Sequence, residues 1–111
     1  MRMDRTNDYT KACMEAWLHC ENLLFILEGR EISFSKRTIQ VIDECAQVCL
    51  GTFECIKEFS GNVYKSALLC FGICEECAEV CDKYEGDAFQ KCAAACRKCS
   101  SAIAGLASSA V

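Results

Sequence analysis

The chain has 111 residues, of which twelve are cysteines and none is proline. Its 12 basic and 16 acidic residues give a formal net charge of −4 without a basic tract, which excludes nucleic acid as an expected partner. The length predicts a single domain over residues 1–111, and the lack of proline favours an all-α chain.

The first predicted helix covers residues 8–28 and ends before Gly29, because glycine commonly follows the last turn of a helix. Side chains three and four positions apart share one face of a helix. Applied here, this spacing predicts a core stripe made of Cys13, Trp17, Cys20, Leu24 and Leu27.

The second predicted helix covers residues 35–59, with Ser35 or Ser33 as its N-cap. Its predicted core stripe consists of Thr38, Ile42, Cys45, Cys49 and Ile56. Cys55 falls just off this stripe, so we expect it at a boundary between helices.

The third predicted helix covers residues 63–84, after a break at residues 60–62. Its core stripe is predicted to be Ala67, Cys70, Cys74, Cys77, Cys81 and Tyr84. Gly86 is expected to stop it, and Asp87 with Gln90 reads as a capping box for a fourth helix over residues 88–107. The stripe of that helix is Ala88, Cys92, Cys96, Cys99, Ile103 and Leu106.

Four helices of similar length with short connections predict an antiparallel, up-down-up-down four-helix bundle with a cysteine-lined core. In this arrangement Cys81 and Cys92 lie near one end of the bundle. Cys13, Cys49 and Cys70 lie toward the opposite end, so the thiols are expected to form a ladder between apolar layers.

The cysteine pattern does not favour a disulfide scaffold. Cβ atoms at i and i+4 of a helix lie roughly 5–6 Å apart, whereas a disulfide requires about 3.5–4.5 Å. Pairing between helices stays open. The polar segment of residues 1–11 shows no secretory signal, and no apolar run is long enough to span a membrane. We therefore expect a reduced, cytoplasmic protein with metal-binding thiols.

Rows of thiolates select Cu(I), Zn(II) or iron–sulfur clusters. Structural zinc sites usually use paired knuckles on turns, and clusters usually use wrapped loops. Cu(I) accepts two or three thiolates, which an i,i+4 pair and a facing helix can supply, so the pattern favours several Cu(I) ions. We predict that all twelve cysteines are ligands: Cys13, Cys20, Cys45, Cys49, Cys55, Cys70, Cys74, Cys77, Cys81, Cys92, Cys96 and Cys99.

Other interpretations remain open at this point. One is an iron–sulfur electron-transfer protein, and another is a helical interaction protein whose cysteines bind zinc or serve packing. No catalytic constellation is visible, so we do not expect an enzyme. Met1, Met3 and Met14 lie near one end of the first helix, where thioethers could serve copper entry, or where they form only a flexible N-terminus and one packing side chain. His19 adjoins Cys20 beside the core stripe and is expected at a boundary between helices or exposed.

The segments around the cysteines resemble the bacterial copper storage proteins, a family of cysteine-rich four-helix bundles. The resemblance rests on Tyr9–Ala16 (YTKACMEA), Glu44–Cys49 (ECAQVC), Cys74–Cys81 (CEECAEVC) and Cys92–Cys99 (CAAACRKC). It implies a bundle that stores many Cu(I) ions, association into homo-oligomers that are commonly tetramers, and a cytosolic location for members without an export signal. A copper chaperone would then be a candidate delivery partner.

The chain also departs from this family pattern. Family members usually carry more cysteines on the first helix, where Trp17, Leu24 and Leu27 are expected in the core of this chain. Ile103 takes a similar position on the fourth helix, and Cys55 matches the pattern less well than the other cysteines. The resemblance therefore implies a lower copper capacity than is usual for the family.

Overall fold

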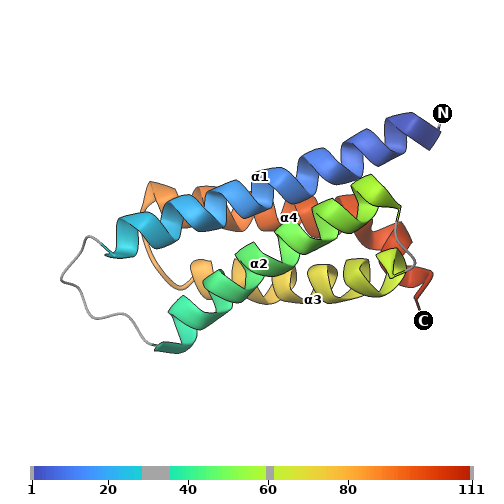
Figure 1. The fold of residues 1–111 in the computed structure, drawn as a ribbon. Coiled ribbons are helices and arrows are strands. Elements are labelled where there is room, and N and C mark those ends of the chain that lie inside the picture. Colours follow the sequence, from blue (N-terminus) through green and yellow to red (C-terminus); the bar gives the residue numbers. More distant parts are fainter. Residues whose placement is uncertain (1, 29–35, 60–61, 111) are drawn as a thin grey trace.

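The computed structural model describes residues 2–28, 36–59 and 62–110, with side chains from residue 7 onward. These ranges form four helices and no strand: α1 (Arg2–Glu28), α2 (Lys36–Glu58), α3 (Val63–Cys81) and α4 (Asp87–Ser108). Figure 1 shows the helices side by side, with the N-terminal end of α1 projecting away from the other three.

The helices pack in a ring that follows chain order. α1 and α3 each pack against both α2 and α4, so α1 lies diagonally opposite α3, and α2 lies diagonally opposite α4. The molecule is elongated, with principal extents of 46 × 23 × 19 Å. The predicted all-α antiparallel bundle with a cysteine-lined core is thereby confirmed.

Two helix ends differ from the expected ranges by more than one residue. α1 begins at Arg2 rather than at residue 8, because the polar first turns continue the helix beyond the core. α3 ends at Cys81, three residues before the expected end. The amides of Lys83 and Tyr84 bind carbonyls three residues back at 3.1 Å, and such bonds tighten and close the last turn of a helix.

The start of α4 also differs from the expectation. Gly86, expected to stop the third helix, is the N-cap of α4, and no side-chain cap bond is present there, so the predicted capping box is wrong. Gly86 has φ 126°, a conformation that favours glycine because it has no Cβ. Asp87 lies in the first turn, where the helix dipole favours a negative charge. The features expected at Gly29, Ser33 and Ser35 lie outside the described residues.

The interior face of α1 contains Cys13, Cys20 and Leu27 as predicted, but it differs from the predicted stripe at two positions. Ala16 and Leu23 are fully buried, whereas Trp17 and Leu24 only pack partly buried against the core. Both sets of positions advance by threes and fours, so spacing alone fits either. Packing of α1 against α2 and α4 determines which of the two sets is buried.

Apolar layers flank the cysteines at both ends of the bundle. Leu23, Leu27 and Phe89 gather where α1 approaches the start of α4. Tyr84, expected in the core stripe, lies beyond the end of α3 with its ring stacked on Phe89, at 4.8 Å between centroids. The Tyr84 hydroxyl also shares a hydrogen bond of 2.9 Å with Thr38.

At the opposite end, Ile56, Val63 and Ile103 are buried. Thr52 is fully buried there and donates a hydrogen bond of 3.2 Å to the carbonyl of Ser66, which joins α2 to α3. None of the helices formed by the described residues is long and apolar enough to cross a membrane.

Candidate metal centre

The core of the bundle is a continuous column of thiols. All twelve cysteines are free, and eleven of them are buried. We call these eleven residues the thiol column: Cys13, Cys20, Cys45, Cys49, Cys70, Cys74, Cys77, Cys81, Cys92, Cys96 and Cys99. The spacing of threes and fours aims each thiol at the bundle axis, because it keeps the cysteines of one helix on one face.

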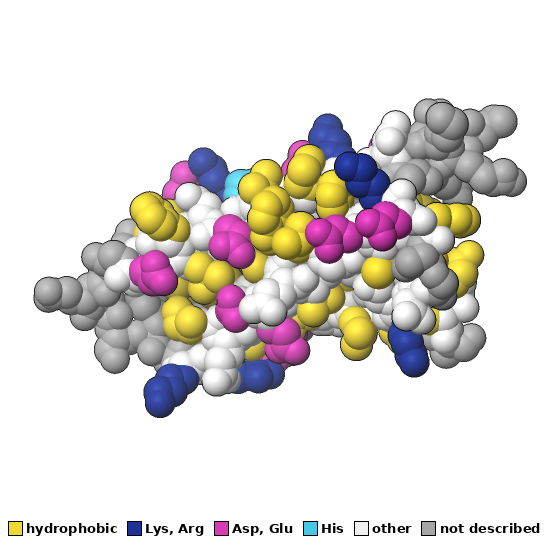
Figure 2. Space-filling model, viewed as in Figure 1, with side chains coloured by type: hydrophobic (Ala, Val, Ile, Leu, Met, Phe, Trp, Pro, Cys, Tyr) yellow, Lys and Arg dark blue, Asp and Glu magenta, His cyan; other side chains and the backbone are white. Residues whose placement is uncertain are grey.

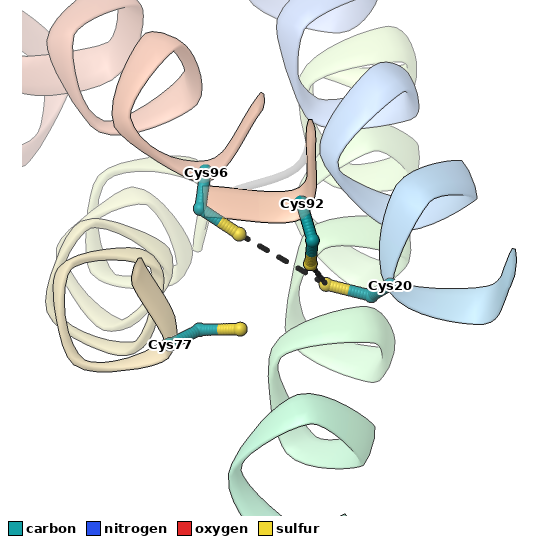
Figure 3. A group of neighbouring side chains, drawn as sticks. All are labelled: Cys20, Cys77, Cys92 and Cys96. Atoms are coloured by element: carbon teal, nitrogen blue, oxygen red, sulfur yellow. Dashed lines mark hydrogen bonds between the residues drawn. The ribbon is translucent and has the colours of Figure 1, made fainter. Parts of the chain in front are cut away.

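Four of these thiols converge near the end of the column that faces the α3–α4 turn. We call Cys20, Cys77, Cys92 and Cys96 the first tetrad; their Sγ atoms all lie within 4.8 Å of one another. The Cys20 sulfur is 3.6 Å from that of Cys92 and 3.9 Å from that of Cys96. Figure 3 shows the side chains pointing toward a common centre from α1, α3 and α4.

A second tetrad is built in the same way, from one thiol of α2, two of α3 and one of α4. It consists of Cys49, Cys70, Cys74 and Cys99, with all four sulfurs within 4.8 Å of one another. The sulfurs of Cys49, Cys70 and Cys74 form a closed triangle with edges of 3.5, 3.7 and 3.9 Å. Cys99 completes the group from α4, at 3.9 Å from Cys70.

Cys45 on α2 joins the two tetrads. Its sulfur lies 3.7 Å from Cys96 of the first tetrad, and 3.9 Å from both Cys49 and Cys74 of the second. The three sulfurs of Cys45, Cys74 and Cys96 also lie within 4.8 Å of one another, and we call them the linking trio. Neighbouring groups therefore share sulfurs, so ions bound along the column would share ligands.

The two ends of the column are formed by Cys13 and Cys81. The Cys13 sulfur lies 3.8 Å from that of Cys99 and extends the second tetrad toward the apolar layer of Ile103. Cys81 follows Cys77 by one turn of α3, and a hydrogen bond with Cys77 raises the pKa of its thiol. Both end residues are almost completely shielded from solvent, with exposed fractions of 0% and 1%.

Hydrogen bonds between thiols shift their pKa values in both directions. Hydrogen bonds with Cys20 and Cys45 hold the Cys96 pKa well below its ordinary value. A hydrogen bond with Cys13 likewise lowers the pKa of Cys70. Each tetrad therefore contains at least one thiol whose pKa is lowered by its neighbours.

Other thiols in the column are held in their neutral form. Hydrogen bonds with Cys45, Cys49 and Cys70 raise the pKa of Cys74, and burial acts in the same direction. A soft metal ion must displace these protons, because only the thiolate is a strong ligand. Metal binding at the column therefore releases protons.

Not every candidate from the sequence reaches the column. Cys55 is half-buried and takes part in no thiol–thiol contact among the described residues, so the structure separates it from the other eleven predicted ligands. His19 lies at a surface hollow with Glu15 and Lys98. Met14 is 38% exposed on the outside of α1, and the side chains of Met1 and Met3 lie outside the described residues.

The two tetrads are not evident from the amino-acid sequence. Each combines an i,i+4 pair on one helix, Cys92 with Cys96 or Cys70 with Cys74, with one thiol from each of two other helices. The i,i+4 pairs are visible in the sequence. Their partners depend on the positions of the helices relative to one another along the bundle axis, which cannot be read from the sequence.

The fold and the core define a four-helix bundle whose interior is built to hold soft metal ions. The chain matches the model of the family described as copper storage protein (Csp) over residues 2–108, and it belongs to that family. Among solved structures, it is similar to the "Cu(I)-bound Copper Storage Protein BsCsp3", with a TM-score of 0.88 and 24% sequence identity over 93% of this chain and 98% of that one. No curated protein sequence matches the chain significantly.

Proposed function

We propose that the chain stores or buffers Cu(I), and that the thiolates of the thiol column are its ligands. The observation that carries this proposal is the unbroken sulfur path from Cys92 through Cys45 to Cys13, in which neighbouring sulfurs lie 3.6–3.9 Å apart. Soft thiolates select Cu(I). The structurally similar copper storage protein BsCsp3, described as Cu(I)-bound, supports the choice of this ion.

The triangle of Cys49, Cys70 and Cys74 shows how one ion would be held. Its edges of 3.5, 3.7 and 3.9 Å are close to equal, so one ion at its centre would meet three thiolates at similar distances. Similar sets along the column share sulfurs through the linking trio. The arrangement therefore supports several ions per chain, with all eleven column cysteines as ligands.

An iron–sulfur cluster fits this core less well. The sulfurs of each tetrad already lie close together, and a cluster would need space between them for several iron and sulfide ions. Single ions fit between the thiols without such an expansion. A storage role also requires no catalysis, and we do not propose an enzymatic activity.

The cellular setting belongs to the same proposal. Twelve free cysteines are typical of a protein in a reducing compartment, which supports the cytoplasm. Copper would then arrive from a partner such as a copper chaperone. Hydrophobic side chains gather over the middle of α1 (Figure 2), where Met14 and Leu18 are 38% and 49% exposed, and such a surface supports association into homo-oligomers, with tetramers as the proposed state. Sedimentation equilibrium of the loaded protein would test the oligomeric state.

An anaerobic Cu(I) titration tests the central proposal. Fully reduced, metal-free protein competes for Cu(I) with a chromophoric chelator, and we expect tight uptake of several equivalents per chain. Replacing Cys74, Cys77, Cys96 and Cys99 together with serine disrupts both tetrads and should remove most of this uptake. Cys55→Ser is the matched control and should keep the full capacity, because Cys55 lies outside the column. Uptake of one equivalent or none by the unmodified chain would refute storage.

A further inference from the structure

We propose that the two tetrads are also separate sites for a tetrahedral divalent ion of the Zn(II) class, so that the copper-free chain binds two such ions, one in each tetrad. The proposal concerns a second kind of ligand at the core. It is argued from the sulfur geometry alone and does not depend on copper storage.

The distances within each tetrad match the requirements of zinc. Structural zinc sites hold four sulfurs at about 2.3 Å from the ion in a tetrahedron, which places the sulfurs about 3.8 Å from one another. In the second tetrad, four of the six sulfur pairs lie 3.5, 3.7, 3.9 and 3.9 Å apart, and the other two lie within 4.8 Å. In the first tetrad, two pairs lie 3.6 and 3.9 Å apart, and the other four lie within 4.8 Å.

The origin of the ligands makes both sites rigid. Each tetrad takes two thiols from one helix and one from each of two neighbouring helices. An ion bound there ties three helices together, and little movement is needed because the sulfurs are already gathered. Continuous helical rows of cysteine, which on sequence grounds did not favour zinc, therefore produce two four-sulfur sites once the helices pack.

Zinc binding at each tetrad changes the charge of the core and releases protons. One Zn(II) ion and four neutral thiols give one four-thiolate zinc centre with a net charge of −2 and four released protons. Thiols outside the tetrads remain available to donate S–H bonds to these thiolates. Cys45 lies 3.7 Å from Cys96 and 3.9 Å from Cys74, and Cys13 lies 3.8 Å from Cys99.

Cys77 and Cys99 distinguish the tetrads, because each belongs to one of them and neither belongs to the linking trio. Cys45 is the matched control. It is as deeply buried and contacts both tetrads, but it is a member of neither. In a core that binds zinc through any available thiols, Cys45 would matter as much as Cys77. In a core with two defined tetrads it would not.

The experiment is an anaerobic Zn(II) titration of the reduced, metal-free full chain. Native mass spectrometry counts the ions, and zinc X-ray absorption counts their sulfur neighbours. We expect two ions per chain, each with four sulfurs at about 2.3 Å. Cys77→Ser and Cys99→Ser should each retain one four-sulfur ion, their combination should retain none, and Cys45→Ser should retain two.

Several results would overturn the inference. They are a stoichiometry of one or none for the unmodified chain, a first shell made mostly of nitrogen or oxygen, or a loss in Cys45→Ser equal to that in Cys77→Ser. Far-UV circular dichroism identifies any variant that fails to fold, in which case Cys20→Ser and Cys70→Ser take the places of Cys77→Ser and Cys99→Ser. A chain that binds many Cu(I) ions but no Zn(II) overturns this inference alone, whereas zinc binding without copper uptake overturns the proposed function alone.

Discussion

The sulfurs of Cys45 and Cys96 lie 3.7 Å apart across the diagonal of the bundle. Because Cys45 also contacts Cys49 and Cys74 of the second tetrad, it links that tetrad to Cys96 of the first. α2 and α4 do not pack side by side, so the contact between Cys45 and Cys96 passes through the centre of the core. It makes the interior one connected set of ligands instead of two isolated clusters.

Cys45→Ser should lower copper capacity. The substitution removes the linking trio, so we expect the variant to bind fewer Cu(I) ions per chain by one or more in the chelator competition. Cys55→Ser, on the same helix and outside the column, should match the unmodified protein. Equal capacity in both variants would show that the trio holds no ion.

The reduced, metal-free bundle should be less stable in alkali. Hydrogen bonds with other thiols, together with burial, raise the folded-state pKa of thiols such as Cys20, Cys45 and Cys74 above the ordinary value of 9.0. Stability from such groups is fully present below the ordinary pKa and is lost as the pH rises beyond it. Thiols with lowered pKa values, such as Cys70 and Cys96, act in the opposite sense, but they are the minority in the column.

The measurement is urea unfolding under anaerobic reducing conditions from about pH 7.5 to about pH 10. The midpoint concentration should fall as the pH increases, because a column that becomes charged also repels itself. A midpoint that is constant or rises over this range would contradict the assignment of neutral thiols to most of the column.

Leu23→Ala should strongly destabilise the metal-free protein. Leu23 is fully buried, and truncating a buried leucine to alanine costs roughly 2–5 kcal/mol. Leu18→Ala on the same helix is the control, because Leu18 is 49% exposed and a surface change of this kind costs about 0.5 kcal/mol or less. Similar unfolding midpoints for the two variants would place Leu23 outside the core.

The metal-free chain should be folded. Buried apolar side chains flank the thiols at both ends, and each large one contributes roughly 1.5–3 kcal/mol when it leaves water. Far-UV circular dichroism of the reduced protein with a chelator present should show a helical spectrum. A random-coil spectrum would mean that the metal, and not the apolar layers, drives folding.

Cys55 should be the first cysteine to react with a thiol reagent. It is half-buried, whereas the other eleven cysteines are buried. Brief treatment of the native, reduced protein with iodoacetamide should label one site per chain, and peptide mapping should locate it at Cys55. Cys55→Ser should remove this fast phase, and rapid labelling that persists in the variant would show that the column is open to solvent.

The buried faces of α3 and α4 could be predicted from the spacing of their cysteines. The cysteines of α3 and α4 advance only by threes and fours, so their common face was evident, and all seven are buried. The interior face of α1 was less certain. Only two cysteines mark it, and the choice between Trp17 with Leu24 and Ala16 with Leu23 depends on packing against other helices.

The burial of most of the cysteines was predictable, but their grouping was not. Sequence spacing shows that Cys70 pairs with Cys74, but it cannot show that Cys49 and Cys99 join them, because this depends on the heights at which the helices pack. Cys55 illustrates the opposite limit. It is one of twelve cysteines in a chain with an obvious pattern, and its position one residue before the buried Ile56 of α2 is enough to separate it from the column.

The near-complete burial of the column affects how bound metal ions are released. Ten of its eleven cysteines have no exposed surface and Cys81 has 1%, so a chelator or acceptor protein cannot touch a bound ion while the helices stay together. Unloading must wait for a local opening of the bundle, whose frequency depends on the free energy of that opening. The residence time of the metal is then governed by helix packing as well as by metal–sulfur bonds, and residues such as Leu23 that touch no ion would help to set it.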